Sequence, residues 1–166
     1  VTRAGIHHEL GHELVTPPAI WAQALEVRDG VQQIPGIDQA RDFLPHIFNI
    51  IEDGRMERHL SRTYAGVAEV LAASCRLEPR WDEQVGEAVP VPSQLAGALL
   101  YTSLPFFAVS TAVAQGMAPR ARQLFDEFEP VVRRGVSGSA AEAFAAAVKL
   151  TRRFEEEGFF DSPREG

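Results

Sequence analysis

The sequence predicts an all-α fold, and three observations lead to this expectation. Apolar side chains recur at intervals of three and four residues over most of the chain, which is the period of a helix packed on one face. No segment shows the strict alternation of apolar and polar residues that is typical of a half-buried strand. Turn-forming prolines and glycines mark the ends of several periodic segments. A chain of 166 residues can bury one sizeable core, so we expect residues 1–166 to form a single helical domain.

The predicted helices are, in chain order, residues 2–14, 16–28, 38–63, 64–77, 93–114, 118–134 and 139–157. The Thr-Pro-Pro sequence at residues 16–18 ends the first helix and begins the second, because proline is favoured in a first helical turn. Pro45 marks a break or a fresh start near the beginning of the third helix. Ser139 is the expected N-cap of the last helix. Residues 78–93, which contain three prolines, are predicted to form a loop.

The stretch from residue 88 to residue 119 contains no charged side chain. It is long enough for a membrane span, but polar residues and Pro105 interrupt it. We therefore favour a buried central helix over residues 96–114, kinked at Pro105, and expect no membrane association.

The sequence His8-Glu9-Leu10-Gly11-His12 carries the strongest functional signal. On a helix, two histidines four residues apart lie on one face and can bind one Zn²⁺. Glu9 would then act as a general base on a water activated by the metal.

Packing of the same helix can also be predicted. Ile6, Leu10 and Leu14 form an apolar stripe, which predicts a half-buried helix. Gly11 disfavours a helix, so its presence suggests close approach of another element or room for a substrate.

A catalytic zinc needs a third protein ligand, and Glu52 is the candidate we favour. It follows Ile50 and Ile51 on the third predicted helix, and an acidic residue beside an apolar face needs a partner such as a cation. The alternative is a solvated face with Glu–Arg pairs at helical spacing. Cys75 is the only cysteine and is better explained as a small buried thiol than as a ligand.

These two motifs together resemble the gluzincin branch of the zincin metallopeptidases. More narrowly, they are similar to metallopeptidase regions that accompany von Willebrand factor A modules in cobaltochelatase-subunit-like proteins. The similarity covers about the first 65 residues, through the segments at residues 7–16 (HHELGHELVT) and 49–57 (NIIEDGRME).

The resemblance implies a role for each matching residue. His8, His12 and Glu52 would bind zinc and Glu9 would be the base. The residues expected to support these ligands are Asn49, Asp53, Arg55 and Glu57. Tyr64 and His59 are candidates to stabilise an oxyanion or to contact substrate, and His46 is also considered, although its apolar neighbourhood favours a core histidine.

One departure from the family pattern concerns the sheet that precedes the His-Glu helix in zincins. The sequence given has seven residues before His8, which is too few for that sheet. We therefore expect a helical zincin-like bundle without it, as part of a longer chain.

Composition limits the classes of partner. The net charge of −7 argues against a nucleic-acid partner. A single cysteine excludes an internal disulfide, and no basic segment followed by an apolar one opens the sequence, so we expect a cytoplasmic protein without a signal peptide.

Two functions are consistent with these features. The first is a zinc-dependent peptidase or hydrolase acting on a peptide or protein. The second is a catalytically silent, metal-stabilised helical module that serves an assembly with an ATPase or a von Willebrand factor A module.

Overall fold

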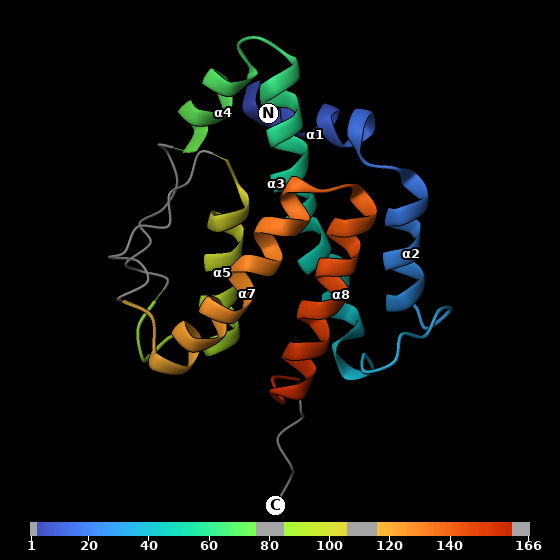
Figure 1. Cartoon of the computed structure of the whole chain (residues 1–166), viewed down its shortest axis with the longest axis vertical. Coiled ribbons are helices and arrows are strands. Elements are labelled where there is room, and N and C mark those ends of the chain that lie inside the picture. Colours follow the sequence, from blue (N-terminus) through green and yellow to red (C-terminus); the bar gives the residue numbers. More distant parts are fainter. Residues whose placement is uncertain (1–2, 76–84, 106–115, 161–166) are drawn as a thin grey trace, which may run out of the picture.

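The computed structural model describes residues 3–75, 85–105 and 116–160, and this part of the chain is helical (Figure 1). The helices are α1 (Arg3–Val15), α2 (Pro18–Arg28), the 3₁₀ helix η1 (Gln39–Phe43), α3 (Leu44–Thr63), α4 (Val67–Cys75), α5 (Val91–Ser103), α7 (Pro119–Ser137) and α8 (Ala140–Glu156). The described residues contain no strand, only an isolated bridge between Ile34 and Ile37. The all-α prediction is therefore confirmed.

Proline and capping residues set several helix boundaries. Pro18, Pro45 and Pro119 lie in the first turns of α2, α3 and α7, where a missing backbone N–H costs nothing. Ser139 is the N-cap of α8, as predicted, and forms a capping box with Glu142. The expected loop extends through residues 85–90 where it is described, and α5 begins at Val91.

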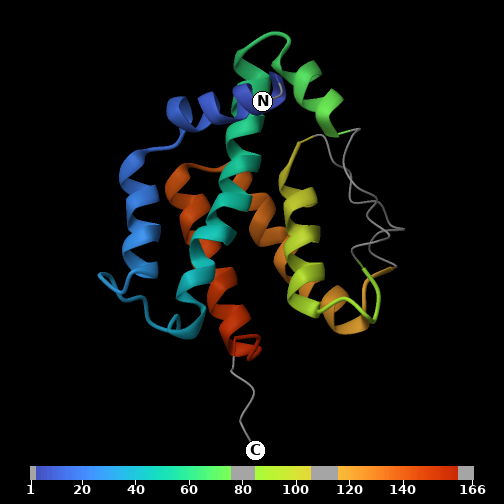
Figure 2. The same ribbon diagram turned by 180° about the vertical axis from the view of Figure 1, so that it is seen from behind.

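Helix α3 occupies the centre of the molecule. It packs against α1, α2, α4, α5, α7, α8 and η1. Figure 2 shows α3 in front of α7 and α8, with α5 and α2 on either side and α1 across one end. The predicted centre was instead the apolar segment at residues 96–114. That segment is helical only to Ser103 in the described chain, and its continuation at residues 106–114 lies outside the described residues.

The main core lies where α3 meets α5, α7 and α8. Its largest fully buried side chains include Phe48, Ile51, Leu99, Phe128 and Phe154. Two glycines allow the backbones to approach closely. A Cβ atom at Gly54 would lie 2.4 Å from the backbone oxygen of Ser103, and one at Gly135 would lie 2.8 Å from Ile51 Cγ2. Only glycine fits at these crossings.

Helix α1 packs on α3 and α4 through the face that contains Gly11. A Cβ atom at Gly11 would lie 2.1 Å from Met56 Sδ, so the glycine serves close approach. The predicted half-burial of the apolar stripe is wrong, because Ile6, Leu10 and Leu14 are 49%, 53% and 66% exposed. The opposite face of α1 is the one that packs on α3.

The charge-free segment is long enough for a membrane span, and part of it forms α5 in the described chain. None of the described helices combines the length and the apolar character that crossing a bilayer requires.

Replacing Gly54 with alanine tests the contact between α3 and α5. Alanine should favour the helix by up to about 1 kcal/mol. The clash with the Ser103 backbone cannot be relieved by a rotamer change, so we expect a net loss of about 1–3 kcal/mol in the free energy of unfolding. Urea unfolding of the variant and the wild type measures this difference. An unchanged or higher stability would contradict the close crossing.

Candidate metal centre

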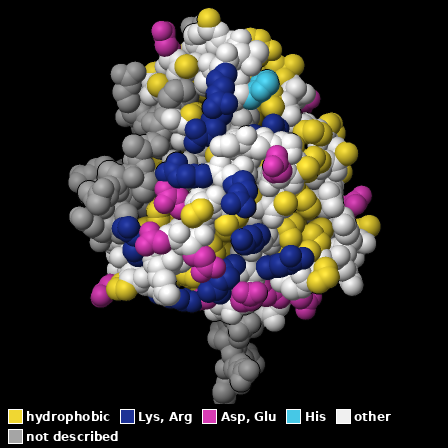
Figure 3. Space-filling view, viewed as in Figure 1, with side chains coloured by type: hydrophobic (Ala, Val, Ile, Leu, Met, Phe, Trp, Pro, Cys, Tyr) yellow, Lys and Arg dark blue, Asp and Glu magenta, His cyan; other side chains and the backbone are white. Residues whose placement is uncertain are grey.

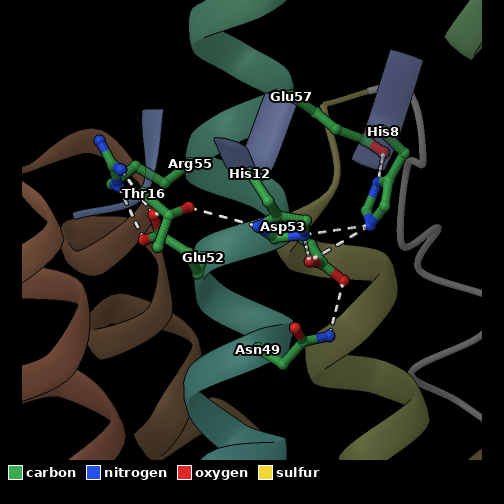
Figure 4. A network of polar contacts seen from close by, with 8 residues as sticks. All are labelled: His8, His12, Thr16, Asn49, Glu52, Asp53, Arg55 and Glu57. Atoms are coloured by element: carbon green, nitrogen blue, oxygen red, sulfur yellow. Dashed lines mark hydrogen bonds and ion pairs between the residues drawn. The ribbon is translucent and has the colours of Figure 1, made fainter. Parts of the chain in front are cut away.

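Three donor atoms from α1 and α3 converge between the two helices (Figure 4). His8 and His12 lie one turn apart on α1, and their Nε2 atoms are 3.3 Å apart. Oδ1 of Asp53, on α3, lies 2.9 Å from Nε2 of His12 and 3.5 Å from Nε2 of His8. Within the described residues, these three side chains form a cluster that could hold a metal ion.

The spacing and the chemistry of this cluster fit a divalent metal. Zinc bonds of about 2.0–2.1 Å at tetrahedral angles place neighbouring ligand atoms about 3.3 Å apart. The observed separations of 2.9, 3.3 and 3.5 Å lie around this value. Oδ1 of Asp53 is buried and accepts no hydrogen bond, although both imidazoles are near. A buried carboxylate oxygen left in this state is suited to bind a cation.

The other nitrogen of each imidazole is held by a hydrogen bond. Nδ1 of His8 donates to Oε1 of Glu57 at 3.0 Å. The hydroxyl of Thr16 donates to Oε1 of Glu52 at 2.8 Å and therefore accepts from Nδ1 of His12 at 3.3 Å. In the neutral imidazoles, both arrangements place the ring proton on Nδ1 and leave the Nε2 lone pair facing Asp53. This is the tautomer that a metal bound through Nε2 requires.

Glu52 does not belong to the cluster of donor atoms, which differs from the sequence prediction. It is fully buried, and its carboxylate is bound by Arg55 through Nε at 2.8 Å and Nη2 at 2.5 Å. Nη2 of Arg55 also donates to the backbone oxygen of Val15 at 2.9 Å. Glu52 therefore has its charge balanced by Arg55 and touches the centre only through Thr16.

The expected supporting residues contact different members of the network. Asn49 donates to Oδ2 of Asp53 at 3.1 Å, which orients that carboxylate. Glu57 contacts His8 and Arg55 contacts Glu52, as described above. Asp53, expected only in support, is the residue that completes the cluster.

A cleft of about 400 Å³ opens beside the two histidines. It is lined by His8, Glu9, His12, Glu13, Thr16, Pro18, Trp21 and Asn49. Glu9 is exposed and therefore lies at the same opening as the candidate ligands.

Tyr64 and His59, expected near an oxyanion, do not line this cleft, and both are exposed at the far end of α3. His46 is exposed beside Phe43 rather than in the core, so that prediction is wrong. The side chain of Cys75 lies outside the described residues.

The cluster shifts the ionisation of its members in the metal-free protein. Contact with Asp53 and the hydrogen bond to Glu57 raise the pKa of His8 from 6.5 to about 10, against the lowering effect of burial. Burial would raise the pKa of Asp53, but His12 and His8 together hold it below its usual value. Without a metal, a proton on His8 therefore supplies the positive charge that the two carboxylates need.

Sequence reasoning missed Asp53 as a candidate ligand and Thr16 as a contact of His12. One signal was present, because Asp53 and Glu57 are four residues apart, as His8 and His12 are. Two such pairs on neighbouring helices can lie face to face, so that each residue of one pair is opposite a residue of the other. Glu52 lies about 100° around the helix from Asp53 and cannot share that face.

Comparisons of the chain with protein-family models, with curated proteins and with solved structures gave no match.

The pKa of His8 can be tested in metal-free protein by nuclear magnetic resonance of the imidazole. We expect a midpoint near 10, because two carboxylates face the ring. The folded pKa exceeds the value of 6.5, so this proton stabilises the fold fully below pH 6.5 and the stabilisation is lost as the pH rises toward 10. Glu57→Gln should bring the midpoint down. A wild-type midpoint near 6.5 would contradict the arrangement.

Proposed function

We propose that the chain is a zinc-dependent hydrolase of the peptidase type, with His8, His12 and Asp53 as metal ligands. The observation that carries the proposal is the convergence of three donor atoms at tetrahedral spacing, with both Nδ1 atoms held by hydrogen bonds. Two imidazoles and one carboxylate match the ligand set of catalytic zinc sites, which keep a fourth position open. The adjoining cleft gives that position access to a substrate.

The chain's own residues supply the remaining chemistry in this proposal. Bound zinc lowers the pKa of a water toward neutrality and polarises a carbonyl. Glu9, at the mouth of the cleft, would take the proton of the attacking water and pass it to the leaving amine. Pro18 and Trp21 form an apolar wall against which a substrate side chain would pack.

A second candidate function is a metal-stabilised module without turnover, and the placement of α1 favours it. This helix packs mainly on α3 and α4 and leaves three large apolar side chains exposed. A metal would then fix α1 to α3 and present that surface to an assembly. In keeping with the family resemblance, we propose an ATPase or a von Willebrand factor A module as the partner, in the cytoplasm.

Metal analysis after purification without chelators tests the ligand set. We expect one Zn²⁺ per chain in the wild type and almost none in His12→Ala or Asp53→Ala, because each removes a ligand. Glu52→Gln should retain zinc with an affinity about 10–100-fold lower, as is usual for groups behind the ligands. If Glu52→Gln lost zinc as fully as Asp53→Ala, Glu52 would be the ligand instead.

Conservative changes at Thr16 test how His12 is oriented. Thr16→Ser keeps the hydroxyl that links His12 to Glu52, so zinc affinity should stay within about threefold of the wild type. Thr16→Val keeps the shape but removes that link, and should weaken zinc by about 10–100-fold. Competition with a zinc indicator dye measures both values. Equal affinities for serine and valine would show that the hydroxyl has no such role.

Glu9→Gln separates the two candidate functions. In an enzyme it should keep zinc and lower kcat by at least about 10²–10⁴-fold, because the basic oxygen is lost. Cleavage of a peptide library by the zinc-loaded protein, followed by mass spectrometry, measures this change. Glu13→Gln, on the same side of the cleft, is the matched control and should keep most activity. If wild-type protein with full zinc cleaved no peptide, the metal-stabilised module would be the better account.

A further inference from the structure

The loop between α2 and α3 borders a cavity of about 530 Å³ that lies apart from the candidate metal centre. In Figure 1, α1 lies near the top of the molecule and this loop lies toward the bottom. No described residue lines both the cavity and the cleft beside the histidines. Sites for small ligands usually have volumes of about 300–1,000 Å³. The size of the cavity therefore suits a small molecule.

A tight turn forms an apolar part of the cavity wall. Ile34 and Ile37 both line the cavity, and the backbone N–H of Ile37 donates to the carbonyl of Ile34 at 3.0 Å. Pro35 and Gly36 occupy the centre of the turn, where Gly36 has a φ of 78° that suits glycine. Nε of Arg152, on α8, donates to the carbonyl of Pro35 at 2.7 Å. The turn is therefore held by its own backbone and by α8.

Asp38 presents a free carboxylate to the same cavity. It is the N-cap residue of η1, a position where an aspartate side chain usually binds backbone N–H groups, yet its carboxylate makes no capping bond. Glu155 of α8 instead accepts hydrogen bonds from the backbone N–H groups of residues 38, 39 and 40, at 2.9, 3.0 and 2.8 Å. The carboxylate of Asp38 is thereby released from capping and has no hydrogen bond or ion pair within the described residues.

Arg41 brings a cation to the cavity. It lies three residues after Asp38, and residues at this spacing lie on the same side of a 3₁₀ helix. Its guanidinium passes beside Gly30, where an added Cβ atom would lie 3.5 Å from Nη1. Figure 3 shows charged side chains of both signs at the lower end of the molecule, where α8 ends. Arg153 of α8 is paired with Glu157, whereas no hydrogen bond or ion pair of the described residues involves the side chain of Arg41.

We propose that this cavity binds a small zwitterion, an α-amino acid with an apolar side chain. Such a ligand carries one charge of each sign at pH 7, which matches the two unpaired groups. Arg41 would bind its carboxylate through paired N–H groups, and Asp38 would accept from its ammonium group. The ligand's side chain would pack against Ile34 and Ile37. Both charged residues are exposed, so a ligand can reach them from solvent.

Isothermal titration of the full chain with L-leucine tests the site. The protein is first freed of metal and dialysed at constant ionic strength, so that the amino acid cannot bind through zinc. We expect saturable binding of one leucine per chain, weakened at least about tenfold in Arg41→Gln and in Asp38→Asn, because each loses a charged hydrogen bond. Asp42→Asn is the matched control, since it changes an exposed acid of the same 3₁₀ helix that does not line the cavity. Its affinity should stay within about twofold of the wild type.

The stability of the variants separates binding from folding. The side chains of Asp38 and Arg41 have no partner within the described residues, so Arg41→Gln and Asp38→Asn should keep the wild-type Tm in leucine-free buffer. A loss of binding with an unchanged Tm then reports on the ligand alone.

Two analogues of leucine test whether both charges are read. L-Leucine amide lacks the carboxylate and 4-methylpentanoate lacks the amine, so each leaves Arg41 or Asp38 without a partner. Each should bind at least about tenfold more weakly than L-leucine. Three results would overturn the proposal: no saturable binding of L-leucine to the wild type, an equal loss in Asp42→Asn and Asp38→Asn, or equal affinities for L-leucine and either analogue.

Discussion

Three buried carboxylates on the central helix set the main constraint on this structure. Glu52, Asp53 and Glu57 are at most 8% exposed, on a helix that also supplies much of the core. Buried carboxylates require partners, and α1 with the residue after it provides most of them. His8 contacts Glu57, His12 contacts Asp53, and Thr16 contacts Glu52. This polar match helps to position α1, and in the described residues its apolar packing involves Gly11 and Val15 against the cluster around Met56 and Leu60.

The same constraint explains what the sequence could and could not predict. Six of the helices lie where periodicity and proline positions put them, because those signals are local. The placement of His8, Glu9 and His12 on one helix could likewise be predicted, since their spacing depends only on local helical geometry. The choice between Glu52 and Asp53 depends on the rotation of α3 relative to α1, and this rotation also brings Met56 against Gly11. Long-range packing of this kind leaves no periodic trace in the sequence.

The exposed stripe of α1 shows a second limit. Ile6, Leu10 and Leu14 have the spacing of a core-facing stripe, yet the polar face of the helix is the one that packs inward. Pattern reasoning assigns the apolar face to the core because hydrophobic burial usually dominates. In this structure, the polar face of α1 instead packs inward, because its histidines contact the buried carboxylates of α3. The charge-free segment near α5 misled in a similar way, because the central position went to a helix that carries several charged residues.

The glycine contact behind the candidate metal centre also has a consequence for which metal the proposed site would select. Met56 and Leu60 pack beneath Gly11, where α1 approaches α3 closely, and so contribute to the distance between the two helices. That distance sets how far Asp53 stands from the two imidazoles, and metals differ in the bond lengths and ligand numbers they accept. The side chain of Met56 is thus one of the groups that set the size of the proposed metal site. In the proposed metal site, a substitution at Met56 would alter the preference among metals while every donor atom stays in place.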